Sequence, residues 1–196
     1  MTPVMYIDRD GTFPEWLADI GRFIGGALIT VAAGVVIYYT HKFIWIPGLA
    51  TVPLFAINMM GYGSMLMASP FDSTLKSDMD RIGWNPFNTN EDKVLRSDNV
   101  SFYKGTMVIR YGTHSTSGGG FSYGIIGIGR GETRLSTVRH EYGHHKQQRL
   151  MGLALYTPVV AIPSLISAAT SRPGVHANRW YERWATDWGN RGWIWW

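Results

Sequence analysis

The hydrophobic and polar positions divide the chain into an apolar first third and a more mixed remainder. Residues 23–40 and 43–71 contain no charged side chain; glycines interrupt the first stretch, and prolines and glycines interrupt the second. The first stretch is about long enough to cross a lipid bilayer as a helix, and the pair suits a helical hairpin. Two interpretations stay open for residues 23–71: contact with or insertion into a membrane, or packing within a core or under a chaperone.

Residues 72–99 are mainly polar, and residues 85–92 have the composition of turns. We therefore expect an apolar helical region at residues 1–71 and a second domain at residues 72–196. The length of 196 residues, with 45% hydrophobic content, allows one substantial core plus a separate apolar segment.

Two strands are expected just after this boundary. Residues 100–111 and 121–128 are rich in aromatic and β-branched side chains, as strands are. Residues 115–120 form a flexible, glycine-rich connection between them. The two runs are expected to pair as a small antiparallel sheet.

A polar helix should follow the strands. Thr133 or Ser136 can cap its start, residues 139–149 are mostly polar, and Gly152 provides a stop after Met151.

Beyond that helix, residues 157–169 are apolar and interrupted by proline, which indicates a buried irregular segment or a short helix returning beneath the site. Residues 177–189 are expected to form the last helix.

Composition excludes several chemistries. The chain has no cysteine, so disulfide bonds, thiolate zinc sites and cysteine nucleophiles are all excluded, and any metal must be held by histidine and carboxylate. The formal net charge of +4 comes from basic residues spread along the chain, without a basic arm, so no nucleic-acid partner is expected. The first twenty residues are acidic and lack the pattern of a cleavable secretion signal, so export would need another route.

Residues 140–144 spell HEYGH, an HExxH motif. Residues four apart on a helix are rotated by about 40° and rise about 6 Å, so His140 and His144 face a shared point from successive turns. Two imidazole nitrogens placed in this way can bind one zinc ion. Glu141 is rotated about 60° from His144. Its carboxylate can therefore reach the open coordination position and act as general base on an attacking water.

A catalytic zinc ion needs a third protein ligand and one position for water. The downstream candidates are Glu182, His176 and Asp187. Glu182 is favoured, because E-x-x-A from this residue resembles the third-ligand helix of glutamate-type zincins, in which a small residue such as Ala185 lets that helix approach the motif helix. His176 stays open as a ligand and is otherwise expected to be catalytic, stabilising the oxyanion of the tetrahedral intermediate. Zinc is the expected ion, although such donor sets also accept other divalent ions.

The remaining aromatic and histidine residues suggest structural roles. Trp180, Trp184 and Trp188 form one helical stripe opposite Glu182. We expect this stripe to pack in the core, with a membrane-interface belt as the other interpretation. His145 is rotated about 100° from His144, so it should face solvent or a carboxylate.

Several motifs together resemble a known family. They are N-P-F-N-T-N at residues 85–90, S-F-Y-K-G at 101–105, R-H-E-Y-G-H-x-x-Q-Q at 139–148, I-P-S-L-I-S at 162–167 and E-x-x-A from Glu182. In this order they resemble the zincin-type C-terminal domain of Rhs-repeat and related polymorphic toxins of bacteria. The resemblance covers about residues 85–190.

The resemblance implies a zincin-like metallopeptidase that acts as a secreted or delivered effector, paired with an immunity protein. It also implies that an apolar region ahead of the catalytic part serves translocation or is shielded by a chaperone. Glutamate-type zincins have an aspartate directly after E-x-x-A, where this chain has Thr186 and only then Asp187. Either Thr186 takes over the orientation of a ligand histidine, or the helix bulges there.

The sequence therefore predicts an α+β fold: a zincin-like core with a small antiparallel sheet, an HExxH helix and a third-ligand helix, preceded by an apolar helical region. The predicted function is a zinc metalloendopeptidase acting on a protein or peptide, with ligands His140, His144 and Glu182 and general base Glu141. Two other classes stay open. One is a membrane-inserting toxin that acts through residues 23–71, and the other is an inactive zincin-like binding module with a structural metal.

Overall fold

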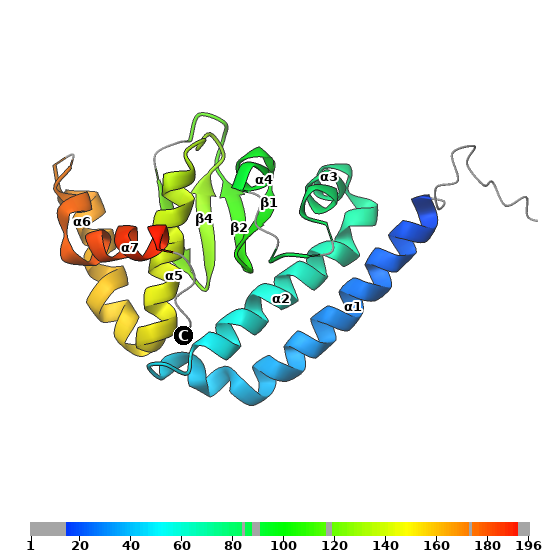
Figure 1. The fold of residues 1–196 in the computed structure, drawn as a ribbon, viewed down its shortest axis with the longest axis horizontal. Helices are drawn as coiled ribbons and strands as arrows, with labels where there is room; N and C mark the ends of the chain where they lie inside the picture. Colours follow the sequence, from blue (N-terminus) through cyan, green and yellow to red (C-terminus); the bar gives the residue numbers. More distant parts are fainter. Residues whose placement is uncertain (1–14, 84, 88–90, 117–118, 173, 192–196) are drawn as a thin grey trace, which may run out of the picture.

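A computed structural model describes residues 15–83, 85–87, 91–116, 119–172 and 174–191 (Figure 1). The described chain is α+β and mostly helical, as predicted, with one small sheet and two apolar helices ahead of it. Residues 1–14, on which most of the prediction about a secretion signal rests, lie outside the described residues.

The longer helices are α1 (Glu15–Thr40), α2 (Thr51–Ala68), α3 (Ser73–Ile82), α4 (Glu91–Arg96), α5 (Leu135–Tyr156), α6 (Ile162–Thr170) and α7 (Trp180–Asn190). The strands are β1 (Val100–Tyr103), β2 (Thr106–Tyr111), β3 (Gly120–Tyr123) and β4 (Ile125–Gly129). Short helical turns are η1 (His41–Trp45), η2 (Ser69–Phe71), η3 (Thr157–Ala161) and η4 (His176–Asn178). The predicted domain boundary at residue 72 falls between η2 and α3 and stays a prediction.

The sheet consists of two hairpins side by side, in the strand order β1-β2-β4-β3. β1 turns into β2 at Lys104 and Gly105, which both have positive φ, and β3 turns into β4 at Gly124, also with positive φ. The hairpins join through a parallel pairing of β2 with β4, so the sheet is mixed. The predicted antiparallel pairing of residues 100–111 with 121–128 is wrong, because a tight turn bends each run back on itself.

Helix α5 packs on this sheet and carries the HExxH motif (Figure 1). Val138 and Tyr142 of α5 are buried against Val108, Ile126 and Ile128 of the sheet. Tyr142 also contacts Tyr103 edge to face, with ring centroids 5.2 Å apart. This core fixes the position of the motif helix relative to the strands.

The start of α5 differs from the prediction. Neither Thr133 nor Ser136 caps the helix; the N-cap residue is Arg134, whose side chain makes no capping hydrogen bond. The carboxylate of Glu132 accepts a hydrogen bond of 2.8 Å from the backbone amide of Arg134 instead. This bond fixes the N-cap residue itself and does not replace a capping hydroxyl, which would accept from an amide of the first helical turn.

Gly152 breaks the helix where predicted. Its φ of 66° and ψ of 160° are not helical, and a Cβ atom there would lie 2.7 Å from the carbonyl oxygen of Trp45 in η1. The chain then continues through η3 into α6, so residues 157–169 are helical. Of the two expectations for this segment, the buried irregular one is wrong, since Leu165 is 72% exposed, whereas the expected short helix is present as α6.

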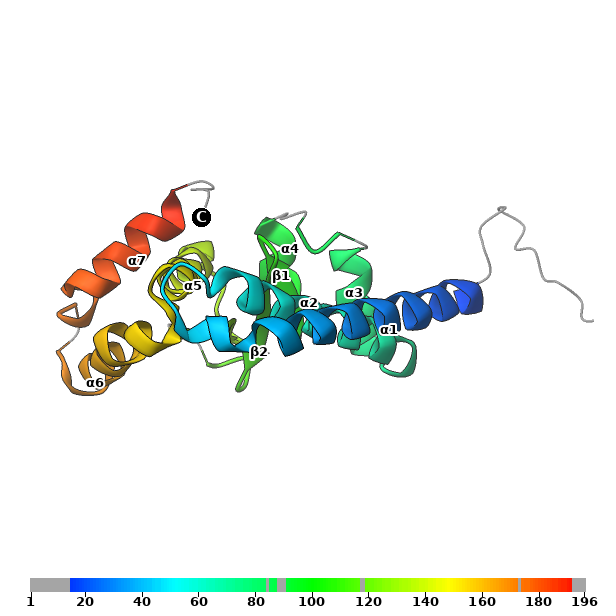
Figure 2. The same ribbon diagram turned by 90° about the horizontal axis from the view of Figure 1, so that it is seen from below.

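Helices α1 and α2 form the predicted apolar hairpin, with α1 on the outside (Figure 2). They cross at Gly26 and Gly63, where a Cβ atom on either residue would lie 2.5–2.6 Å from the backbone oxygen of the other. Asn58 fixes α2 to the sheet, because its side chain donates to the carbonyl of Gly124 and accepts from the amide of Met107. Helix α2 therefore lies between α1 and the strands.

The tryptophans of α7 lie on the side opposite the buried residues of that helix. The rings of Trp180 and Trp184 are tilted by 31° with centroids 6.0 Å apart, and Trp184 contacts Trp188 edge to face with centroids 4.6 Å apart. Trp180 is 55% exposed, so the prediction that this stripe packs in the core is wrong for Trp180. The tryptophans at 193, 195 and 196 lie outside the described residues.

Helices α5 and α7 pack with their backbones in contact. A Cβ atom on Gly143 would lie 1.8 Å from the carbonyl oxygen of Ala185, and one on Gly189 would lie 1.8 Å from that of Arg139. Glycine at both positions allows this approach, which the small Ala185 also permits. The contact brings the first turn of α7 over the motif of α5.

Replacement of Gly189 by alanine tests this contact. We expect Gly189→Ala to lower the free energy of unfolding by about 1–3 kcal/mol, because the added methyl group meets backbone rather than a movable side chain. The control is Gly34→Ala in α1, where a Cβ atom meets nothing within 4 Å. That change should be neutral or stabilise by up to about 1 kcal/mol. Urea unfolding measures both variants, and equal stabilities would contradict the close contact.

Candidate metal centre

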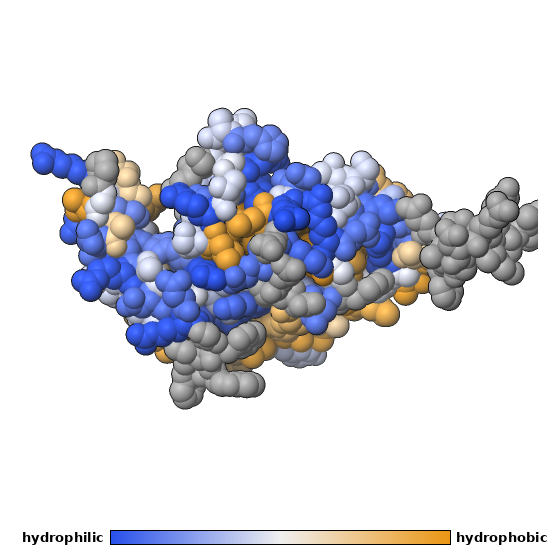
Figure 3. Space-filling model, turned by 45° about the horizontal axis from the view of Figure 1, so that its top comes forward, coloured by the Kyte–Doolittle hydropathy of each residue, from blue (hydrophilic) through white to orange (hydrophobic). Residues whose placement is uncertain are grey.

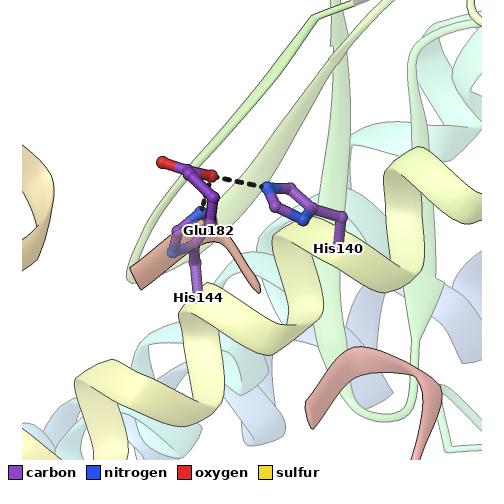
Figure 4. A group of neighbouring side chains, drawn as sticks. All are labelled: His140, His144 and Glu182. Carbon is purple, nitrogen blue, oxygen red and sulfur yellow. Dashed lines mark hydrogen bonds and ion pairs between the residues drawn. The ribbon is translucent and has the colours of Figure 1, made fainter. Parts of the chain in front are cut away.

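Two histidines of α5 and one glutamate of α7 converge on a single point (Figure 4). The Oε2 atom of Glu182 lies 2.9 Å from Nε2 of His140 and 3.1 Å from Nε2 of His144. The two imidazole rings are nearly perpendicular, with centroids 4.8 Å apart. The structure thus brings together the three side chains predicted as ligands, as a group that could hold a metal ion.

The local structure explains this convergence. His140 and His144 lie one turn apart on α5, on the side that faces α7. Glu182 lies in the first turn of α7 and is only 1% exposed. The backbone contact between Gly143 and Ala185 sets the short distance between the helices.

Two of the three ligand-atom separations suit a metal ion of about the size of zinc. Ligand atoms at about 2.0–2.1 Å from a tetrahedral zinc ion stand about 3.3 Å from one another. The two distances from Glu182 to the histidine nitrogens are within a few tenths of an ångström of that separation. All the candidate ligand atoms lie within 4.8 Å of one another. Small side-chain movements would therefore suffice to admit the ion.

Hydrogen bonding around His144 favours a cation at this point. Gln147 donates from Nε2 to the carbonyl of Tyr181, so its Oε1 atom, 2.8 Å from Nδ1 of His144, must accept a proton from that ring. A neutral His144 then has only a lone pair on Nε2, which faces the carboxylate of Glu182. Two acceptors in contact repel each other unless a metal ion or a second proton lies between them. A metal ion would satisfy both.

Thr186 orients the other histidine. Its hydroxyl lies 2.9 Å from Nδ1 of His140, on the side of the ring away from Glu182. The sequence allowed either a threonine that orients the histidine or a bulge in the helix; the structure shows the contact between threonine and the histidine ring. Metal-binding histidines normally have such a partner on the second ring nitrogen.

Glu141 is buried beside this group. The side chain lies against Gly120 of β3, where a Cβ atom would come within 2.7 Å of the carboxylate, and is 5% exposed. Burial raises the pKa of Glu141 to about 7, against the opposing influence of His140 and with a further increase from the charge of Glu182. The carboxylate predicted as general base is therefore held between the metal ligands and an edge strand.

The other predicted residues fall in different places. Nε2 of His176 lies 3.6 Å from Oε1 of Glu182, so this histidine contacts the third ligand. Asp187 is exposed and does not belong to the ligand group. His145 is fully buried and stacks on Tyr142, so the expectation that it faces solvent or a carboxylate is wrong.

Two contacts of the site were not predicted from the sequence. Gln147 orients His144, and the hydroxyl of Ser164 in α6 donates a hydrogen bond of 2.5 Å to Oε1 of Glu182. The spacing of Gln147, three residues after a ligand on the same helix, was a signal that could have identified it. Nothing local marks Ser164, because its partner lies on another helix.

Comparison with protein-family models, with curated proteins and with solved structures found no match. The resemblance to zincin-type toxin domains therefore stays a prediction, and the site stands on its own geometry.

Gln147 and Gln148 offer a test of the orienting contact. We expect Gln147→Leu to weaken zinc binding by about 10–100-fold, because His144 loses the group that fixes its tautomer. The control Gln148→Leu removes hydrogen bonds to Gly124 and Ser122 of the sheet. That change should lower the stability and leave zinc affinity within a few-fold. Competition with a coloured chelator measures the affinities, and similar losses in both variants would contradict the assigned role.

Proposed function

We propose that the protein is a zinc-dependent metallopeptidase that hydrolyses peptide bonds. The observation that carries the proposal is the convergence of two imidazole nitrogens and one carboxylate oxygen, with the buried carboxylate of Glu141 beside them. Two histidines and one carboxylate form a common donor set of catalytic zinc. This set leaves a coordination position for substrate or water.

The chemistry requires few protein groups. A zinc ion bound by these ligands would polarise the scissile carbonyl and lower the pKa of a nearby water to about 7. Glu141 takes a proton from this water as the oxygen attacks the carbonyl carbon, and gives the proton to the leaving nitrogen when the C–N bond breaks. His140 and His144 would hold the ion through Nε2, with their rings oriented by Thr186 and Gln147.

The sheet supports binding of an extended substrate. Strand β3 pairs only with β4 among the described strands, so it lies at the edge of the sheet. On the outer side of this strand the carbonyl of Ser122 already accepts from Gln148 and Tyr156, so a substrate could pair with the strand only near Gly120. Gly120 of this strand lies directly against Glu141. A peptide that lies along such an edge can use backbone hydrogen bonds and bring a carbonyl toward the general base. The oxyanion role of His176 stays a prediction.

The biological setting has weaker support. The proposal of a zincin-like core, and of a secreted bacterial effector delivered to a target and neutralised by an immunity protein, rests on the motifs of residues 85–190 alone.

Substitution of the proposed base tests the reaction. We expect Glu141→Gln to bind zinc at 1:1 stoichiometry and to lose hydrolysis by about 10²–10⁴-fold, because an amide cannot accept the proton. His140→Ala should lose both zinc and activity. The exposed His114 provides the control, since His114→Ala should keep both. Metal analysis and cleavage of a peptide library measure the outcomes, and retained hydrolysis in Glu141→Gln would refute its role.

A second candidate function is insertion into, or docking on, a lipid bilayer. Three helical stretches among the described residues are long and apolar enough to cross a membrane by length and composition. The first runs from Trp16 to Trp45, and only 11% of its most apolar part is buried. Figure 3 shows apolar residues gathered along the lower margin of the molecule, where α1 lies.

The exposure of α1 is the observation that favours this candidate. Leu28 and Val31 are 67% and 66% exposed, and no charged residue occurs between Arg22 and His41. At about 1.5 Å per residue, the 26 residues of α1 extend about 39 Å. A helix that is apolar on all sides is normally covered by protein or lipid, and α2 covers only one side of α1.

Charges on the outer side of α1 test the membrane candidate. We expect the double variant Leu28→Glu with Val31→Glu to bind phosphatidylcholine–phosphatidylglycerol vesicles at least about 10-fold more weakly, because a charge in hydrocarbon is unfavourable by about 2.5–3.5 kcal/mol. The control adds the same charges at the exposed Ser73 and Thr74 of α3. Co-sedimentation measures binding, and equal binding of both double variants would exclude contact through α1.

Vesicle leakage separates this candidate from the peptidase. The Glu141→Gln protein should still release a trapped dye if the membrane carries the activity. The same variant should lose biological activity if that activity depends on peptide hydrolysis.

A further inference from the structure

The two carboxylate oxygens of Glu182 have different partners. Oε2 faces the imidazoles of His140 and His144, whereas the other oxygen points away from both rings (Figure 4). That oxygen, Oε1, accepts the hydrogen bond from Ser164. It also lies 3.6 Å from the ring of His176. The carboxylate is thus shared between the ligand group and a separate set of side chains.

We propose that Ser164 is a positioning residue, which fixes Glu182 as a metal ligand through one oxygen only. A free carboxylate can bind a metal through one oxygen or through both. Because Ser164 donates its only hydroxyl proton to Oε1, at a distance typical of a strong bond to an ionised carboxylate, it keeps this oxygen off the metal. The position that Oε1 would otherwise take stays free for water or substrate. The inference rests on the proposed metal centre.

The fold holds Ser164 in this place by a second contact. The hydroxyl of Tyr181 donates a hydrogen bond of 3.0 Å to the carbonyl of Pro163. Consecutive residues of α6, Pro163 and Ser164, therefore bind consecutive residues of α7, Tyr181 and Glu182. This pair of bonds ties the start of α6 to the ligand.

A second serine on the same helix provides a matched control. Ser167 lies three residues after Ser164, is 6% exposed, and its hydroxyl bonds to that of Ser171, 3.0 Å away. It has no contact with Glu182 among the hydrogen bonds of the described residues. A change at Ser167 removes a buried hydroxyl from α6 and leaves the ligand untouched.

The experiment compares Ser164→Ala, Ser164→Thr and Ser167→Ala with the unchanged chain. Affinity for zinc is measured by chelator competition, and coordination by the visible spectrum of the cobalt(II)-loaded protein. We expect Ser164→Ala to bind zinc about 10–100-fold more weakly. Its cobalt spectrum should weaken toward that of a higher coordination number, because Oε1 is free to join the metal. Ser164→Thr keeps the hydroxyl, so it should restore the original spectrum, and Ser167→Ala should leave both readouts unchanged.

Three results would overturn the inference. Unchanged affinity and spectrum in Ser164→Ala would show that the hydroxyl does not position the ligand. Equal changes in Ser167→Ala would assign the effect to the packing of α6. Failure of the unchanged chain to bind zinc or cobalt would instead remove the metal centre itself, and with it the proposed function. Urea unfolding of each variant confirms that the compared proteins are folded.

Discussion

The contact between His144 and Glu182 places the strictest constraint on this molecule. Gln147 requires the proton of His144 on Nδ1, so a lone pair and a carboxylate face each other at 3.1 Å in a buried place. Protein groups alone do not satisfy that contact while the ring is neutral. A divalent cation, or a second proton on the ring, would satisfy it, and the convergence of His140 on the same carboxylate oxygen suits a cation.

Close packing of the helix backbones, made possible by residues without a side chain, keeps these groups in place together with hydrogen bonds. Gly143 and Gly189 let the backbones of α5 and α7 touch, which brings Glu182 within reach of both histidines. Lys146 of α5 donates to the carbonyl of Trp188 near the far end of α7. The ligand helix is therefore held at its first turn, at its middle and near its end.

The sequence predicted the part of the site that depends on one helix. The convergence of His140 and His144 follows from their four-residue spacing on a helix. Glu182 was predicted from the E-x-x-A pattern that resembles glutamate-type zincins. Ser164 could not be identified in this way, because its partner lies on a different helix and only the folded chain brings them together.

The fold was predicted less completely than the site. The helical hairpin and the break at Gly152 follow from composition and from backbone geometry. The sheet did not, because Gly105 and Gly124 lie inside runs that alternate like single strands. Burial of the polar residues of α5 was also unexpected: Gln147 and Gln148 are fully buried, each satisfied by backbone groups of another element.

The crossing of α1 and α2 has a consequence for handling the protein. Since Gly26 and Gly63 bring the two backbones together, α1 covers the outer side of α2 closely. A shortened chain without α1 would not lose its oily surface; it would expose the next layer, around Gly63. Removal of the first helix therefore exchanges one apolar surface for another.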